Sequence, residues 1–130
     1  MLRAFQRGKM LTQKREYGNE AEDLAADYLK QNGYKIIARN YACKTGEIDI
    51  IAQKGGCLVF AEVKARSTQA FGGPVSAVTP AKQKKVTNTA MCFIKERKPK
   101  FDSLMFDIIA VLDGKAQHIQ NAFVPQNFTL

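Results

Sequence analysis

Two short apolar runs carry acidic side chains and a lysine at a spacing that could support chemistry. Residues 46–52 (GEIDIIA) and 58–65 (LVFAEVKA) are rich in β-branched and aliphatic side chains, and Lys54-Gly55-Gly56-Cys57 separates them. This pattern predicts an antiparallel β-hairpin. If the two glycines form the turn, pairing outward from them places Asp49 directly opposite Glu62, so that two carboxylates face each other.

Facing carboxylates need a compensating charge. Directly opposed side chains on a sheet have Cβ atoms only about 4.5–5.5 Å apart, and like charges there are destabilising. Strand side chains alternate between faces, so Glu62 and Lys64 share one face while Val63 points to the other. Two acids beside an ammonium suit a divalent cation such as Mg²⁺, which prefers oxygen ligands, next to a phosphate group.

A plainer interpretation of the same hairpin is a pair of surface strands with scattered charges. In the same register Glu47 lies opposite Lys64, and a salt bridge between them would explain part of the pattern. It would not explain why Asp49 faces Glu62.

Composition limits the class of protein and its partners. A chain of 130 residues is long enough for one domain with a real core. Lys and Arg total 20 against 12 Asp and Glu, which gives a net charge of +8 and favours a polyanionic partner, nucleic acid before an anionic membrane surface. The three cysteines match neither a disulfide framework nor a zinc motif, and no run approaches the roughly 18 apolar residues of a membrane span. We expect a cytoplasmic protein with reduced thiols.

Periodicity and turn signals place the hairpin within a larger α/β order. Residues 1–13 are basic and are expected to form a flexible arm, followed by a single domain over residues 14–130. Thr79-Pro80 is typical of a helix start, and residues 104–112 are almost continuously apolar, as in a central strand. The predicted elements are helices over 14–31 and 80–97 and strands over 34–41, 46–52, 58–65, 104–112 and 116–120.

Three residues outside the hairpin call for interpretation. Glu22 lies on the flank of the apolar stripe of the first predicted helix, where it could lean over the sheet or form a capping box with Asn19. Spacing alone does not choose between these. Asp107 lies within an apolar strand and should find a lysine or a backbone donor. His118 has no second His or Cys nearby and is expected to be a surface residue.

The predicted helix over residues 80–97 and the segment after it carry a cluster of positive charge with Glu96 as the only acid. Its members are Lys82, Lys84, Lys85, Lys95, Arg97 and Lys98. Such a one-signed face predicts contacts with nucleic-acid phosphates, with Arg66 at the end of the hairpin as a further contact. The alternative is a solvated helix face without a partner.

The order of these elements resembles the restriction-endonuclease-like fold of the PD-(D/E)xK nucleases. Within it the sequence is similar to the UPF0102 (YraN-like) family, and to archaeal Holliday-junction resolvases. The motifs that carry the resemblance are Gly46-Glu47-Ile48-Asp49 and Phe60-Ala61-Glu62-Val63-Lys64-Ala65-Arg66, supported by Phe106-Asp107. The resemblance implies an αβββαβ core with a mixed central sheet flanked by helices.

The resemblance also implies roles for individual residues. Glu22, Asp49 and Glu62 would be catalytic acids that bind Mg²⁺ or Mn²⁺ together with the Val63 carbonyl, and Lys64 would orient water and steady the phosphate. Arg66, Lys82, Lys84 and Lys85 would contact nucleic acid. Three positions depart from the family pattern: Ala21 and Ala61 stand where the family usually has Gly and Val, and Met105 stands where an Arg often precedes Phe-Asp.

The resulting expectation is a metal-dependent endonuclease that hydrolyses phosphodiester bonds. DNA is expected rather than RNA, branched or structured DNA follows from the similarity to resolvases, and a homodimer is one candidate assembly. Two alternatives stay open: a nucleic-acid-binding module of the same fold that does not cut, and an assembly protein whose acids are structural.

Overall fold

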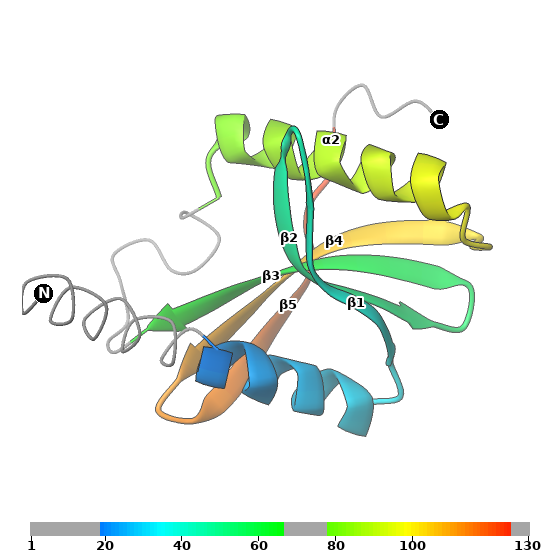
Figure 1. The fold of residues 1–130 in the computed structure, drawn as a ribbon. Helices are drawn as coiled ribbons and strands as arrows, with labels where there is room; N and C mark the ends of the chain where they lie inside the picture. The colour runs from blue at the N-terminus through cyan, green and yellow to red at the C-terminus, as the bar shows by residue number, and fades with distance from the viewer. Residues whose placement is uncertain (1–18, 67–77, 126–130) are drawn as a thin grey trace, which may run out of the picture.

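The computed structural model describes residues 19–66 and 78–125 (Figure 1). The predicted arm over residues 1–13 and most of the predicted loop after the hairpin lie outside these ranges. The described elements are helical residues 19–31, β1 (Lys35–Cys43), β2 (Gly46–Lys54), β3 (Cys57–Arg66), α2 (Pro80–Arg97), β4 (Ser103–Leu112) and β5 (Lys115–Phe123). In this part of the chain no helix is both long enough and apolar enough to span a membrane.

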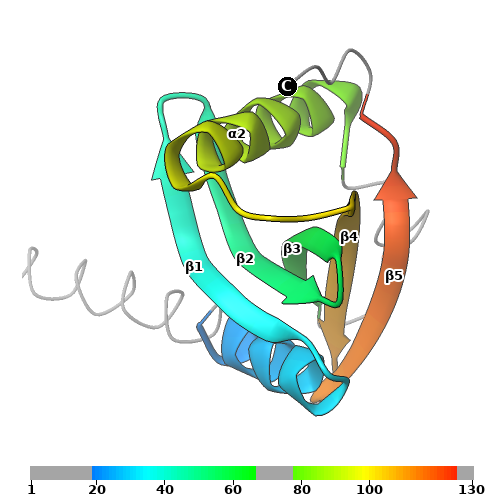
Figure 2. The ribbon, with the colours of Figure 1, turned by 90° about the vertical axis from the view of Figure 1, so that its right-hand side faces the viewer.

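The strands form one five-stranded sheet in the order β1-β2-β3-β4-β5. Neighbouring strands are antiparallel except β3 and β4, which are parallel. Parallel neighbours need a crossover connection, and α2 lies within the crossover from β3 to β4. Helix 19–31 covers one face of the sheet and α2 covers the other (Figures 1 and 2). The predicted mixed sheet flanked by helices is therefore confirmed.

Each face of the sheet buries its own apolar layer. The layer under α2 contains Phe93 and Ala90 of the helix with Phe60 and Phe106 of the sheet. The layer under helix 19–31 contains Ala25, Ala26 and Leu29 with aliphatic residues of β2, β3 and β4. Helix 19–31 can approach the sheet closely because three of its four buried apolar residues are alanines.

The β1–β2 hairpin bends where the two layers meet. Ile48 packs under α2 whereas Ile50 packs under helix 19–31, although strict alternation would place both on one face. In β1, Asn40 has φ of +54°, in the left-handed region that non-glycine residues rarely adopt. The turn end of the hairpin consequently rises beside α2 in Figure 1 instead of continuing the sheet.

Local signals fix the start and end of α2. The Thr79 side chain accepts a hydrogen bond from the Lys82 backbone N–H at 3.2 Å, and Pro80 is the first helical residue, as the sequence predicts. The helix ends at Lys98, which has φ of +48° and donates its backbone N–H to the Ile94 carbonyl. These capping interactions fix the position of the first turn of α2, and therefore of Lys82, which lies in that turn.

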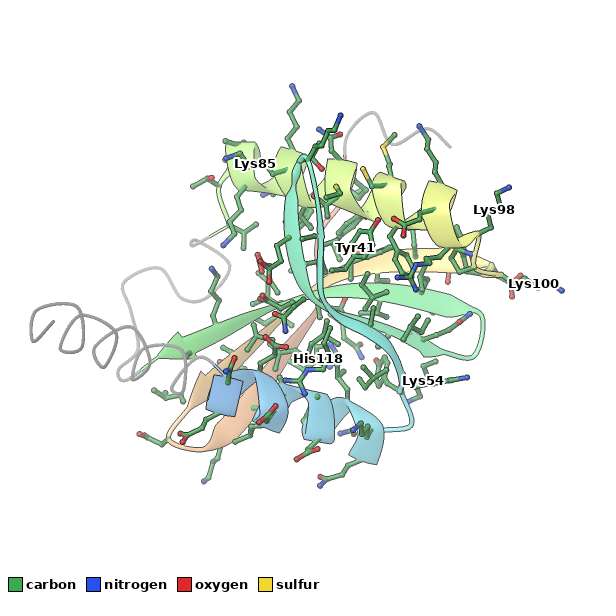
Figure 3. All side chains as sticks on the ribbon, viewed as in Figure 1. Tyr41, Lys54, Lys85, Lys98, Lys100 and His118 are labelled. Carbon is green, nitrogen blue, oxygen red and sulfur yellow. The ribbon has the colours of Figure 1, made fainter. Side chains whose placement is uncertain are left out.

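Asp107 is fully buried in β4, and its carboxylate has two partners. One is the backbone N–H of Asn121 at 2.9 Å, the kind of donor that the sequence analysis expects. The other is Nε2 of His118 at 2.7 Å, and the Tyr28 hydroxyl lies 3.2 Å from Nδ1 of the same ring. The His118 side chain is only 5% exposed, so its placement at the surface was wrong. The imidazole instead ties β5 to β4 and to helix 19–31, as its position in Figure 3 shows.

The aromatic contacts of Phe93 give a direct test of the layer under α2. Its ring is fully buried and lies edge-on to Tyr41 and Phe60, with centroids 5.2 and 6.1 Å away. We predict that Phe93→Ala lowers the free energy of unfolding by about 3–5 kcal/mol, because it removes a buried ring and leaves a cavity. Urea unfolding followed by circular dichroism measures this. Lys95→Ala on the exposed side of α2 is the control, with an expected change within about 0.5 kcal/mol. Equal losses in the two variants would contradict this packing.

Candidate active site

The β2–β3 hairpin has the predicted register. Lys54 pairs with Cys57 and Ile51 pairs with Phe60, and the paired part of the ladder ends at Ile50 opposite Ala61. Asp49 and Glu62 are the next residue on each strand. Because β2 bends away at this point, Gly46 approaches Thr89 and Lys85 of α2 instead of β3. Glu47 and Lys64 both lie in the part of the chain that the structure describes, and they form no ion pair. The bend explains this, because it carries Glu47 away from β3.

The Asp49 carboxylate fills the place where the ladder stops. Its Oδ2 accepts a hydrogen bond from the Val63 backbone N–H at 2.8 Å. The Glu62 carboxyl lies close enough to act on the Asp49 carboxyl, and Glu62 is only 8% exposed. Burial, followed by the neighbouring charge of Glu62, raises the pKa of Asp49 from 3.8 to about 7, against the opposing effects of the Val63 N–H and Lys64. The two acids thus share a proton or need another cation near neutral pH.

Two lysines accompany this carboxyl pair. Lys82 Nζ lies 3.4 Å from Glu62 Oε1, reaching inward from the first turn of α2. Burial lowers the pKa of Lys64, and the adjacent Lys82 ammonium lowers it further, while Glu62 and Asp49 oppose this shift. The sequence analysis assigns Lys82 only to nucleic-acid contact, whereas the structure places it against the acids. Spacing gave no signal of this, because the contact joins a helix and a strand that are distant in sequence.

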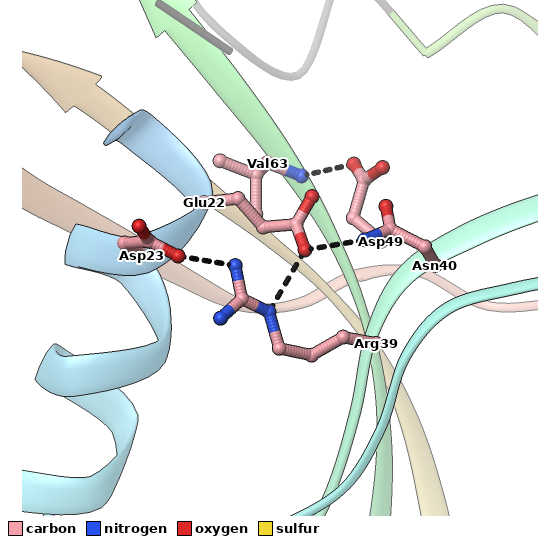
Figure 4. Close-up of polar contacts among 6 residues, drawn as sticks. All are labelled: Glu22, Asp23, Arg39, Asn40, Asp49 and Val63. Atoms are coloured by element: carbon pink, nitrogen blue, oxygen red, sulfur yellow. Dashed lines mark hydrogen bonds and ion pairs between the residues drawn. The ribbon is translucent and has the colours of Figure 1, made fainter. Parts of the chain in front are cut away.

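Glu22 leans over the sheet, the first of its two predicted orientations, but it is engaged by β1. Its Oε1 accepts hydrogen bonds from Arg39 Nε at 2.9 Å and from Asn40 Nδ2 at 3.0 Å (Figure 4). Arg39 Nη2 also lies 2.6 Å from Asp23 Oδ1. Consecutive strand residues normally point to opposite faces, and the left-handed backbone at Asn40 lets both Arg39 and Asn40 reach the same carboxylate. The sequence analysis did not identify these two residues.

The remaining residues predicted to contact nucleic acid are Lys84, Lys85 and Arg66. Lys84 and Lys85 are exposed on α2, and Lys85 and Lys98 mark opposite ends of that helix in Figure 3. Arg66 is the last residue of β3 and pairs with Leu112 of β4.

The chemistry of the donors tests whether a divalent metal fits here. Asp49 and Glu62 offer paired carboxylate oxygens, which suit a hard cation, and the cation would relieve their mutual repulsion. Glu22 is already neutralised by Arg39, and within residues 19–66 and 78–125 no group of three His, Cys, Asp or Glu side chains is arranged to hold a metal ion. The structure therefore brings together two of the three predicted acids with Lys64 and leaves Glu22 in an ion pair.

Comparisons with known proteins identify relatives over most of the chain. Residues 21–111 match the model of a family described as "Uncharacterised protein family UPF0102". A UPF0102 protein of Desulfosudis oleivorans is 40% identical over 116 residues, which cover 88% of this chain and 94% of the relative. A UPF0102 protein of Thermodesulfovibrio yellowstonii is 44% identical over 108 residues, covering 83% and 96%. These names state no activity, so the function has to be argued from the site.

The raised pKa of Asp49 predicts a pH-dependent effect of removing its charge. A carboxyl whose pKa rises from 3.8 to about 7 on folding destabilises the protein progressively as the pH rises through that interval. Without divalent metal, Asp49→Asn should therefore gain stability over the wild type by about 2–3 kcal/mol more at pH 8 than at pH 5. Urea unfolding in EDTA at both pH values measures the difference. Glu47→Gln, an exposed acid of the same strand, should show no such trend. A pH-independent effect of Asp49→Asn would contradict the burial of its charge beside Glu62.

Proposed function

The chain belongs to the UPF0102 family, and we propose that it is a metal-dependent nuclease that hydrolyses phosphodiester bonds in DNA. The observation that carries this proposal is the carboxyl pair of Asp49 and Glu62, held together beside Lys64 and Lys82. Paired buried carboxyls lower stability near neutral pH, and perturbed groups of this kind cluster at functional sites. The similarity to PD-(D/E)xK nucleases supplies the class of reaction.

In this proposal Asp49 and Glu62 hold Mg²⁺ or Mn²⁺, with the Val63 carbonyl as the further ligand that the family resemblance implies. The bound metal would supply positive charge to the phosphate and make a water molecule more acidic. The Val63 N–H fixes the Asp49 carboxylate through Oδ2, so that ligand is oriented before any metal arrives. The Lys82 ammonium lies 3.4 Å from Glu62 Oε1 and places a positive charge beside this acid.

Lys64 can act on the attacking water or on the phosphate. Burial and the Lys82 charge lower the pKa of its amine, so a larger fraction of Nζ than in an ordinary lysine is unprotonated near neutral pH and available to take a proton. In its protonated form the same Nζ can donate to a phosphate oxygen on which charge develops. Both roles require that Lys64 lie near Asp49 and Glu62, and the effect of both acids on the pKa of Lys64 supports this.

Charge distribution favours a DNA approach along α2. Lys84 and Lys85 are exposed on that helix, whereas helix 19–31 on the other face exposes Glu20, Asp23 and Asp27. Together with Arg66 at the end of β3, the lysines would hold backbone phosphates without reading sequence, so binding should weaken steeply with salt. A preference for branched DNA rests on the similarity to resolvases alone.

The ion pair of Glu22 favours a second candidate, a nucleic-acid-binding module that does not cut. With Arg39 and Asn40 on its Oε1, Glu22 is not free to complete a three-carboxylate metal site. Lys64 and Lys82 would then balance Asp49 and Glu62 without any metal. This candidate predicts salt-dependent DNA binding that divalent metals do not alter.

A cleavage assay separates these functions. Four-way junction, duplex and single-stranded DNA are incubated with the protein and Mg²⁺ or Mn²⁺, and binding is measured in parallel in EDTA at several salt concentrations. We predict cutting by the wild type and a loss of at least about 100-fold in Asp49→Asn, which removes one metal ligand and transition-state charge. Glu47→Gln is the matched control and should cut normally.

The other outcomes are equally informative. Salt-dependent binding without cutting under either metal would replace the nuclease with the binding module. Absence of salt-dependent DNA binding would reject both functions and favour an assembly role.

A further inference from the structure

A second group of reactive side chains lies away from the carboxyl pair, where the β1–β2 turn meets α2. Cys43 is the last residue of β1, and Cys92 lies on α2. Both are free thiols, both are half-buried, and both pack against the apolar layer under α2. Each thiol alters the pKa of the other, although the two are far apart in sequence. Figure 2 shows the turn end of the hairpin lying beside α2.

Two threonines connect the β1–β2 turn to α2 beside the thiols. Thr45 Oγ1 lies 3.1 Å from Cys43 Sγ and 2.9 Å from Thr89 Oγ1. Thr89 is one turn before Cys92 on the same side of α2. The turn and the helix are therefore joined by a short polar chain that runs from the Cys43 sulfur to the Thr89 hydroxyl, one helical turn before Cys92.

Exchange within a dithiol needs one thiol that ionises easily and a second that stays protonated, and these two thiols differ in acidity in this way. Burial would raise the pKa of Cys43, but hydrogen bonds from the Thr45 hydroxyl, the Cys92 thiol and the Thr45 backbone lower it to about 7. The hydrogen bond with Cys43, together with burial, raises the pKa of Cys92. One sulfur is thus readily ionised and nucleophilic near neutral pH, while its neighbour stays protonated until it is needed.

We propose that Cys43 and Cys92 form a redox-active dithiol that a low-molecular-weight disulfide oxidises to an intramolecular disulfide, linking the β1–β2 turn to α2. The inference does not depend on the nuclease function. It concerns thiols that the site around Asp49 does not use.

The exchange proceeds in two balanced steps. The Cys43 thiolate attacks one sulfur of oxidised glutathione, whose S–S bond breaks, and one glutathione leaves as a thiolate that takes up a proton. Cys92 then loses its proton and attacks the Cys43 sulfur of the mixed disulfide, which expels the second glutathione. Two protein thiols are oxidised and one glutathione disulfide is reduced to two thiols.

The test uses the full chain in glutathione redox buffers, quenched by alkylation and analysed by intact mass and non-reducing peptide mapping. We expect the wild type to lose two hydrogens in mass and to yield a peptide that links Cys43 to Cys92. Cys92→Ser should stop at the mixed disulfide on Cys43. Cys57→Ser is the matched control and should oxidise like the wild type, because Cys57 packs on the other side of the sheet.

Rates give a second measurement that does not require the disulfide to form. In the reduced protein at pH 7, Cys43 should react with an alkylating reagent roughly three- to ten-fold faster than Cys57. Thr45→Val should reduce this difference, because it removes a hydrogen bond to the sulfur. A wild type that accumulates only mixed disulfides, a disulfide involving Cys57, or equal alkylation of Cys43 and Cys57 would each overturn the proposal.

Discussion

The carboxyl groups of Asp49 and Glu62 lie near each other just beyond the last pair of the β2–β3 ladder, Ile50 and Ala61, and the groups around them limit their repulsion. The Val63 N–H holds one oxygen of Asp49, Lys82 reaches Glu62 from α2, and Lys64 follows two residues after Glu62 on the same strand. These three groups do not fully offset the repulsion between the two carboxylates, since the pKa of Asp49 remains raised by burial and by Glu62. A site that keeps two acids in this state is ready to bind a cation, which is the physical basis of the proposed nuclease.

The bend of the β1–β2 hairpin creates this site. Asn40, with its left-handed backbone, turns β1 toward α2, and β2 leaves β3 at the neighbouring Asp49. A straight hairpin would continue the ladder and pair the acids as ordinary strand residues. The same bend turns Arg39 and Asn40 onto Glu22. One backbone irregularity therefore frees Asp49 for a ligand and at the same time occupies the third acid.

Much of the fold follows from local patterns in the sequence, and the parts that do not are long-range. The Gly-Gly turn predicts the β2–β3 register, Thr79-Pro80 predicts the start of α2, and the apolar run over residues 104–112 predicts a central strand. The left-handed Asn40, the inward reach of Lys82 and the contact of His118 with Asp107 each depend on packing between distant elements. Side-chain types and spacing carry no signal for such contacts, so sequence alone identifies the two paired acids but not the partners of Glu22.

The central claim is that Asp49 and Glu62 form a binding site for a divalent metal. An anomalous difference map from crystals soaked in Mn²⁺ tests it most directly, because it locates the metal without relying on activity. The account predicts one peak in contact with carboxylate oxygens of both residues, at about 2.0–2.6 Å. The same crystals also show whether Glu22 leaves Arg39 to join Asp49 and Glu62 at the metal. The absence of a peak at this position would contradict the account.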